Sequence, residues 1–276
     1  MSKKNYPLAF STLGCPDWTF EQCAEEAAKY GYDALEIRWF DNGIIPSDMS
    51  AQRRAEVKQV VKDTGVGIIG LGVSTRFSSP DADQRAAMLD ELKRYLELAN
   101  DLEAPMVRTF GGQVAEGQTV EQTIDWVAES LAAAMPTAEA QGVTVLLETH
   151  DGFSRGQEVA GVMAQVTNSR LAAVWDVHHP FRMREAIEDT WNFIGDRVAH
   201  IHLKDARLKE DGSWQLVLMG EGEVPCQAIV NLLHQNGYQG AITAEWEQKW
   251  HPEIEGPEVA MPQHMQVISE WVSQLS

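Results

Sequence analysis

Hydrophobic positions along the chain alternate between two spacings. Short runs rich in Val, Ile and Leu, typical of buried parallel strands, occupy residues 8–14, 34–38, 66–74, 106–112, 143–149, 171–177, 198–204 and 241–247. Longer segments with helical spacing lie between them, at 19–31, 53–65, 84–102, 120–142, 158–167, 184–195, 226–238 and 264–275. Eight strand–helix units without a break in composition predict an α/β fold, a single (β/α)8 barrel spanning residues 1–276.

Glycine and proline refine this prediction. Pro136 predicts a kink in the fourth helix, and residues 209–222 predict a hairpin that turns at Asp211-Gly212. An open doubly wound sheet is the structural alternative, but the first strand leads into TLGCPD rather than the GxGxxG phosphate loop that such a sheet favours. Left-handed glycines are expected to close several helices, at Gly31, Gly65, Gly142, Gly195 and Gly237.

Composition narrows the functional classes. Hydrophobic residues make up 44% of the 276, enough for a large core, which excludes a disordered chain. With 22 basic and 41 acidic residues, the net charge of −19 opposes binding to nucleic acids or to anionic membrane surfaces. The three cysteines are an odd number without CxxC spacing, which supports neither a closed disulfide framework nor a zinc knuckle. No secretory signal or membrane-spanning run is evident, so a cytoplasmic protein is expected.

Acidic and imidazole groups end four consecutive predicted strands. In a barrel of this kind, the chemistry sits at the C-terminal ends of the strands. A charged group within such apolar runs costs several kcal/mol to bury unless it is paired or binds a cation. The four residues are Glu148, Asp176, His202 and Glu245.

One divalent cation would resolve the repulsion between the three carboxylates. Three carboxylates and a neutral imidazole favour Mn²⁺, Mg²⁺ or Co²⁺, and Zn²⁺ is also compatible because it binds imidazole well. Taken singly, a glutamate at a strand end is more often solvated, and a histidine such as those in His200-Ile201-His202 is more often a hydrogen-bonded core residue. The metal hypothesis therefore depends on the convergence of all four.

Five motifs resemble the xylose-isomerase-like barrel superfamily, which holds the sugar phosphate isomerase/epimerase proteins, including ketose 3-epimerases and inosose dehydratases. They are ETH (148–150), WDVHHP (175–180), HIHLKD (200–205), GEGEVP (220–225) and AEWE (244–247). The resemblance implies a metal held by Glu148, Asp176, His202 and Glu245. It also implies that Glu148 and Glu245 act as acid and base on opposite faces of the substrate, through an enediolate.

The same resemblance suggests substrate contacts. His179, three residues after Asp176, matches a substrate-binding histidine of the ketose 3-epimerases, although strand parity would place His178 on the face of Asp176. The family also carries an arginine six residues after the metal-binding histidine. Here Leu208 takes that position, with Arg207 beside it, so this chain departs from the epimerase pattern.

Other polar residues near the strand ends each have two possible roles. Lys204 shares the parity of His202 and is either a substrate contact or a salt-bridge partner of an acid at the rim. His150 and Glu247 lie two residues beyond Glu148 and Glu245, where they suit sugar hydroxyls or support of the metal ligands.

Three more side chains, Arg108, Glu36 and Arg38, end the fourth and second strands, either as substrate contacts or as ion pairs between strands. The segment 246–252 offers Trp faces that suit a sugar, a packing lid or a subunit contact. Gly220 and Gly222 leave room for a phosphate, but no dedicated cradle is evident, which favours an unphosphorylated substrate.

The leading functional hypothesis is a metal-dependent isomerase or epimerase of a sugar, sugar phosphate or keto-polyol. A lyase of the inosose dehydratase or C-glycoside-cleaving type shares every ligand, and a non-catalytic barrel that binds metal or carbohydrate is the third alternative. The zinc apurinic-site endonucleases of the superfamily need further histidines on strands two and three, which this chain lacks. The expected partner is a small carbohydrate, and a homo-oligomer is compatible with such a barrel.

Overall fold

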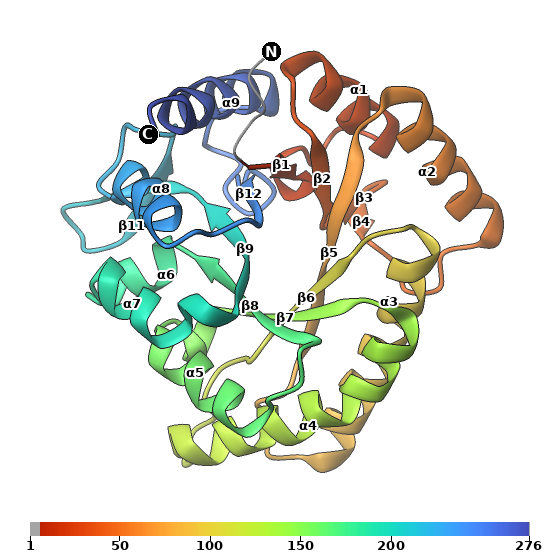
Figure 1. The fold of residues 1–276 in the computed structure, drawn as a ribbon, viewed down its shortest axis with the longest axis vertical. Coiled ribbons are helices and arrows are strands. Elements are labelled where there is room, and N and C mark those ends of the chain that lie inside the picture. The colour runs from red at the N-terminus through yellow and green to blue at the C-terminus, as the bar shows by residue number, and fades with distance from the viewer. Residues whose placement is uncertain (1–5, 276) are drawn as a thin grey trace.

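The protein is a closed barrel of eight parallel strands with the helices outside it, in a computed structural model that describes residues 6–275 (Figure 1). The strands neighbour one another in the order β1-β12-β9-β8-β7-β6-β5-β2. They are β1 (Leu8–Ser11), β2 (Ala34–Ile37), β5 (Gly67–Arg76), β6 (Met106–Phe110), β7 (Thr144–Glu148), β8 (Leu171–Asp176), β9 (Val198–Leu203) and β12 (Ala241–Ala244). The predicted (β/α)8 barrel is confirmed. Seven strands lie within their predicted ranges, and β5 runs on to Arg76.

The outer helices match the predicted helical segments. They are α1 (Phe20–Tyr30), α2 (Ala51–Thr64), α3 (Ala82–Asp101), α4 (Val120–Gln141), α5 (Gly156–Gln165), α7 (Ile187–Ile194), α8 (Cys226–Gln235) and α9 (Pro257–Ser273). The first four start where a Thr, Ser or Asp side chain accepts a backbone N–H of the first turn. Helix α9 begins at Pro257 rather than at residue 264, because proline suits the first helical position.

The glycine predictions hold at four of five positions. Gly31, Gly65 and Gly142 are left-handed caps, and Gly237 is left-handed just beyond α8. The prediction for Gly195 is wrong, since its φ is −53°. A Cβ there would lie 2.6 Å from the Trp191 ring, so close packing is what requires glycine at this position.

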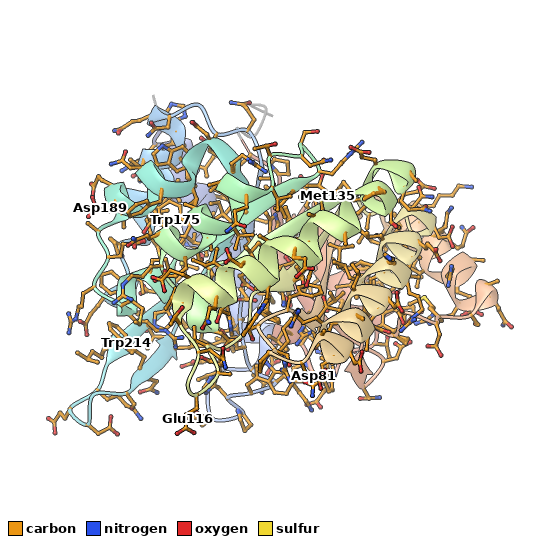
Figure 2. All side chains as sticks on the ribbon, turned by 90° about the horizontal axis from the view of Figure 1, so that it is seen from below. Asp81, Glu116, Met135, Trp175, Asp189 and Trp214 are labelled. Atoms are coloured by element: carbon orange, nitrogen blue, oxygen red, sulfur yellow. The ribbon has the colours of Figure 1, made fainter. Side chains whose placement is uncertain are left out.

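Several short elements lie in the connections between the barrel strands and the outer helices. They are β3 (Trp39–Phe40), β4 (Gly43–Ile44), α6 (His178–Arg182), β10 (Asp205–Leu208), β11 (Trp214–Val217) and single 3₁₀ turns at Thr12–Gly14, Asp151–Phe153 and Gly195–Arg197. The predicted hairpin is β10–β11, which turns through Asp211-Gly212 but starts and ends earlier than residues 209–222. In Figure 2 this hairpin, with Trp214, projects at the same end of the barrel as the loop that carries Glu116.

Other sequence features have plain structural outcomes. Pro136 lies inside α4, which continues to Gln141. All three cysteines are buried and unpaired. Among the described residues, no helix has the length and apolar character needed to cross a membrane.

An apolar layer inside the barrel supports the polar layer above it. Leu146 on β7 and Val174 on β8 belong to a buried cluster with Met106 and Ala172. Glu148 and Asp176 follow two residues later on the same strands, so their side chains point to the same inner face. The interior therefore changes from apolar to charged toward the C-terminal ends of the strands.

Candidate metal centre

Three carboxylates and one imidazole converge at the C-terminal end of the barrel. One ligand atom from each lies within 4.8 Å of the other three, and all four side chains are buried. Their strands β7, β8, β9 and β12 are consecutive around the barrel, and Glu245 directly follows β12. The structure thus brings together the four residues that the strand ends predict, namely Glu148, Asp176, His202 and Glu245.

The ring of His202 is oriented by acids on both sides. Its Nδ1 lies 2.8 Å from Glu148 Oε1 and 3.3 Å from Glu245 Oε1. Its Nε2 lies 2.7 Å from Glu36 Oε2. Nδ1 is therefore the nitrogen that faces the carboxylate cluster.

Two buried cations compensate part of the negative charge. Lys204 Nζ lies 2.7 Å from both Asp176 Oδ2 and Glu245 Oε2, and it also pairs with Glu247. Arg108 Nε lies 3.2 Å from Glu148 Oε2. Lys204 and Arg108 thus make ion pairs with the candidate ligands themselves.

The charges of this cluster are strongly coupled. Burial, together with Glu245 and Glu148, raises the pKa of Asp176 to about 7 despite the opposing effect of Lys204. Burial lowers the pKa of His202, but Glu245, Glu36 and Glu148 raise it well above its ordinary value. Without a further cation, the site therefore holds extra protons on Asp176 and His202.

The cluster fits a divalent cation. Glu148 Oε2 and Asp176 Oδ2 are buried and, despite their ion pairs, accept no well-aligned hydrogen bond. Lone pairs on such oxygens, with a histidine nitrogen beside them, are the donor set that divalent ions bind. A cation here would compete with protons on Asp176 and His202, the two members of the cluster whose pKa is raised.

A pocket of about 380 Å³ opens onto these ligands. Its lining includes Glu148 and Glu245, with Arg108, His150, Glu247 and Trp250. A larger hollow of about 920 Å³ is lined by α2, the start of β5 and the end of α3, and none of the four candidate ligands lines it. The smaller pocket is the candidate active site, because chemistry in such barrels sits at the C-terminal ends of the strands.

The other predicted site residues divide into two groups. His150 and Glu247 line the pocket, and the ring of His150 lies 4.3 Å from that of His179. Arg207 is exposed on β10, donates to the Glu221 carbonyl and does not line the pocket. Leu208, where the family pattern has arginine, lies beside it on the same strand.

The two adjacent histidines of α6 take different places. His179 Nε2 lies 3.5 Å from Asp176 Oδ2. The ring of His178 packs against Trp214 of the hairpin, with centroids 5.3 Å apart. Strand parity does not apply because the strand ends at Asp176 and a helix begins at His178.

Residues from the first half of the barrel complete the pocket. Arg38 donates to the Gly72 carbonyl and to Ser74 Oγ, at 3.2 and 2.8 Å, rather than to an acid on a neighbouring strand. Arg76 and Ser74 also line the pocket, although the sequence did not single them out as site residues. Their only signal was a position at the end of a long strand.

Glycines 220 and 222 do not form a phosphate site. Their backbone N–H groups donate to Asp205 Oδ2, at 3.0 and 2.8 Å. The carboxylate of the chain itself thus takes the position that an anion would need.

The arrangement agrees with the comparisons to known proteins. The family model for xylose isomerase-like TIM barrels matches residues 24–271. Fructoselysine 3-epimerase of Escherichia coli O157:H7 is 23% identical, over 85% of this chain and 88% of that protein. Inosose dehydratase of Yersinia enterocolitica is 24% identical, over 93% of this chain and 94% of that protein.

A solved structure supports the fold independently. The IolI protein, crystallised with a bound zinc atom, superimposes with a TM-score of 0.84 over 98% of this chain and 99% of that chain, at 18% identity. At that identity, the likeness is one of fold.

Proposed function

Because the chain belongs to the xylose isomerase-like TIM barrel family, we propose that it is a divalent-metal-dependent isomerase or epimerase of a small carbohydrate. The observation that carries the proposal is the buried convergence of Glu148, Asp176, His202 and Glu245 within 4.8 Å. The epimerases and inosose enzymes among its relatives support the same class of chemistry.

The four converging residues would hold the ion. Mn²⁺, Mg²⁺ or Co²⁺ suits the three carboxylates, and Zn²⁺ suits the histidine. A bound ion would polarise the carbonyl of a keto sugar and acidify the neighbouring C–H group. Lys204 and Arg108 then limit the negative charge that surrounds the substrate.

Glu148 and Glu245 are the candidate acid and base. They lie at the C-terminal ends of different strands, Glu148 in β7 and Glu245 directly after β12, and both line the pocket. One carboxylate removes the proton from the carbon beside the carbonyl, and the other returns a proton to the opposite face, with an enediolate between the two steps. Burial and the coupled charges around them make such proton transfers sensitive to the environment of each carboxylate.

The remaining polar residues are candidate substrate contacts. His150 and Glu247 line the pocket, where they suit sugar hydroxyls. Trp250 is half exposed at the pocket and offers a face on which a sugar ring can stack. His179 lies beside Asp176, where it can contact a substrate oxygen near the ligands.

Elimination is the second candidate reaction. Several relatives are inosose dehydratases, and the pocket holds a histidine–acid pair, His150 Nδ1 and Asp151 Oδ1, 3.2 Å apart. Such a pair can protonate a leaving group, in which case the enediolate would lose its β substituent instead of regaining a proton.

Solvent exchange distinguishes these reactions. The protein loaded with Mn²⁺ would be incubated in D₂O with a panel of ketoses, ketose phosphates and inososes. Deuterium at the carbon next to the carbonyl, together with a changed configuration or a shifted carbonyl, supports the proposal. Loss of water or of a glycosyl group supports the lyase.

Two variants and a control sharpen the test. Glu148→Gln and Glu245→Gln are expected to lower deuterium exchange at least about 100-fold, because each removes an acid–base group. Glu116→Gln, at the exposed loop in Figure 2, should match the wild type. The enzymatic assignment is contradicted if a sugar binds but no substrate in the panel undergoes exchange or elimination.

A further inference from the structure

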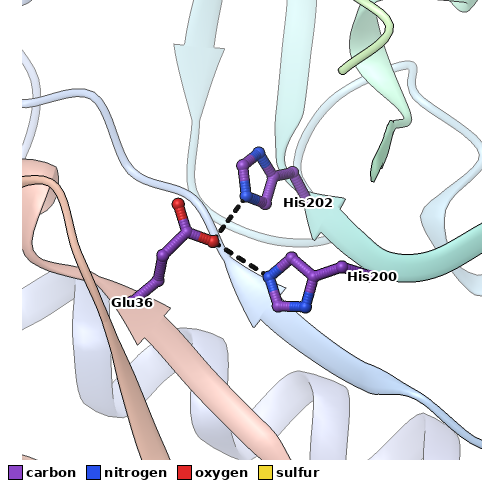
Figure 3. A group of neighbouring side chains, drawn as sticks. All are labelled: Glu36, His200 and His202. Carbon is purple, nitrogen blue, oxygen red and sulfur yellow. Dashed lines mark hydrogen bonds and ion pairs between the residues drawn. The ribbon is translucent and has the colours of Figure 1, made fainter. Parts of the chain in front are cut away.

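Glu36 is a buried carboxylate to which the proposed reaction assigns no role. It is 1% exposed and comes from β2, which is separated from β9 by β1 and β12 around the barrel. Figure 3 shows its Oε2 between two imidazoles of β9. The distance is 2.7 Å to Nε2 of His202 and 2.9 Å to Nε2 of His200.

We propose that Glu36 is a positioning residue for the metal centre. It accepts the Nε2 proton of His202 and thereby fixes the tautomer whose Nδ1 is free to bind the cation, while His200 holds Glu36 in place. This inference rests on the proposed metal centre, and it assigns to Glu36 a role in metal affinity rather than in proton transfer.

The proton count of His202 supports this assignment. A neutral imidazole carries one N–H and one lone pair. A proton on Nδ1 would point into the cluster and would leave the lone pair of Nε2 facing Glu36 at 2.7 Å, which is repulsive. In the metal-loaded protein, a proton on Nε2 instead donates to Glu36 and leaves the Nδ1 lone pair for the cation, whose charge removes the repulsion that this lone pair would otherwise meet from Glu148 and Glu245, 2.8 and 3.3 Å away. The acceptor on one side of the ring thus determines which nitrogen is a ligand.

The position of Glu36 is fixed from several directions. His200 Nε2 donates to the same oxygen, and Thr243 Oγ1 lies 3.0 Å from that nitrogen. On the other side, Glu36 Oε1 is buried, accepts no hydrogen bond from the described residues and lies near Gly72, where an added Cβ would be 3.0 Å from it. A carboxylate constrained in this way holds the His202 ring at a defined orientation.

A second metal ion is the competing explanation. Glu36, His200 and His202 also offer ligand atoms within 4.8 Å of one another. That ion would need a lone pair on Nε2 of His202 at the same time as the first ion uses Nδ1, so the ring would have to lose both protons. A single proton on Nε2 satisfies the same geometry with a neutral ring.

Zinc binding by the 276-residue chain tests the proposal. Affinity and stoichiometry would be measured by competition with a chromophoric chelator for the wild type, Glu36→Gln and the control Glu185→Gln. The control removes a carboxylate that accepts from Gly156 and Thr190, outside the candidate centre. We expect one zinc per chain, a loss of affinity of about 10–100-fold in Glu36→Gln and no change in the control.

Long-range ¹⁵N–¹H spectra of the histidine rings show which ring nitrogen carries the proton. A merely structural role of Glu36 would not affect this result. In the zinc-loaded wild type, His202 should be protonated on Nε2 and bound through Nδ1, whether or not Glu36→Gln folds. Protonation on Nδ1, or an affinity of folded Glu36→Gln within twofold of the wild type, overturns the positioning role and leaves the metal centre intact. Two zinc ions per chain, with one lost in Glu36→Gln, overturn it in favour of the second ion. A wild type that binds no zinc, Mn²⁺ or Co²⁺ overturns the metal centre as well.

Discussion

Lys204 shows how one buried residue balances the acids of the site. It is 1% exposed and pairs with Asp176, Glu245 and Glu247. Burial lowers its pKa, but these acids raise it well above its ordinary value, so the side chain remains charged. Lys204 therefore supplies positive charge whether or not a metal is bound.

Replacing Lys204 by methionine should destabilise the metal-free protein by about 3–5 kcal/mol, because it leaves buried carboxylates without their partner. Saturating Mn²⁺ should recover part of this loss, since a cation then compensates the same acids. Urea unfolding with and without Mn²⁺ measures both effects. Lys209→Met, which removes a lysine that pairs with Asp211 at the surface, is the control and should change the free energy of unfolding far less. A metal-free Lys204→Met protein as stable as the wild type would contradict this account.

Metal affinity should fall as the pH falls, because protons compete with the ion for its ligands. The raised pKa of His202 means that binding displaces one proton across the neutral range. Asp176, with a pKa of about 7, contributes a second proton below that pH. As the pH falls, the dissociation constant should therefore rise about tenfold per pH unit down to pH 7 and more steeply below it. Calorimetric titration with Mn²⁺ from pH 8 to 6 measures this slope, and a flat profile would be incompatible with displaced protons.

At the scale of elements, Asp205 organises the segment between the β10–β11 hairpin and α8. Its two carboxylate oxygens accept backbone N–H groups from Ala206, Gly220, Gly222 and Val224, at 2.8–3.1 Å. A Cβ on Gly222 would lie 2.1 Å from Asp205 Oδ1, so the glycine permits this close approach. The GEG sequence thus has a structural explanation within the chain.

Asp205→Asn should lower the free energy of unfolding by about 2–3 kcal/mol. The amide NH₂ group would face backbone N–H groups whose hydrogen bonds the carboxylate accepts. Thermal and urea unfolding would measure the change, with Asp211→Asn in the exposed turn of the hairpin as a milder control. Equal stability of the two variants would show that the network around Asp205 contributes little.

The strands could be predicted from sequence because each is a short apolar run, as in LAAVWDV at 171–177. The same pattern missed α6, since His178, His179 and Pro180 carry no helical periodicity and their helix depends on the barrel around them. It also placed the hairpin too late, because the pairing of Asp205 with Val217 has no local signature.

The site was predictable where ligands end consecutive strands, as Glu148 and Asp176 do. Glu36 was predicted only as a substrate contact or an ion pair, because its partners are more than 160 positions away, at 164 and 166 residues for His200 and His202. Contacts across a barrel form only when the barrel closes, and no local sequence pattern predicts them. Arg38 shows the same limit, since its acceptors lie on β5.

At the scale of the whole molecule, folding itself assembles the acidic centre. Ligands from β7, β8, β9 and the end of β12 meet only when the barrel is closed. An ion that binds this centre binds the folded protein alone and so stabilises it. The net charge of −19 adds general repulsion that a cation reduces.

Removal of the metal by a chelator should therefore lower the melting temperature. At a free ion concentration of about 100 times the dissociation constant, bound metal contributes about 2.7 kcal/mol, which corresponds to about 5 °C for a domain of this size. Differential scanning calorimetry with EDTA and then with added Mn²⁺ measures the loss and its recovery. The same series on Asp176→Ala should show almost no dependence on Mn²⁺, and a wild-type-like response there would argue against this centre.

Crystallography of the protein soaked in Mn²⁺, with data collected at the manganese absorption edge, tests the shared cation most directly. We predict one strong anomalous peak at coordinating distance from oxygens of Glu148, Asp176 and Glu245 and from Nδ1 of His202. Manganese bound elsewhere in the same crystals, with no anomalous density among these four side chains, would contradict the account.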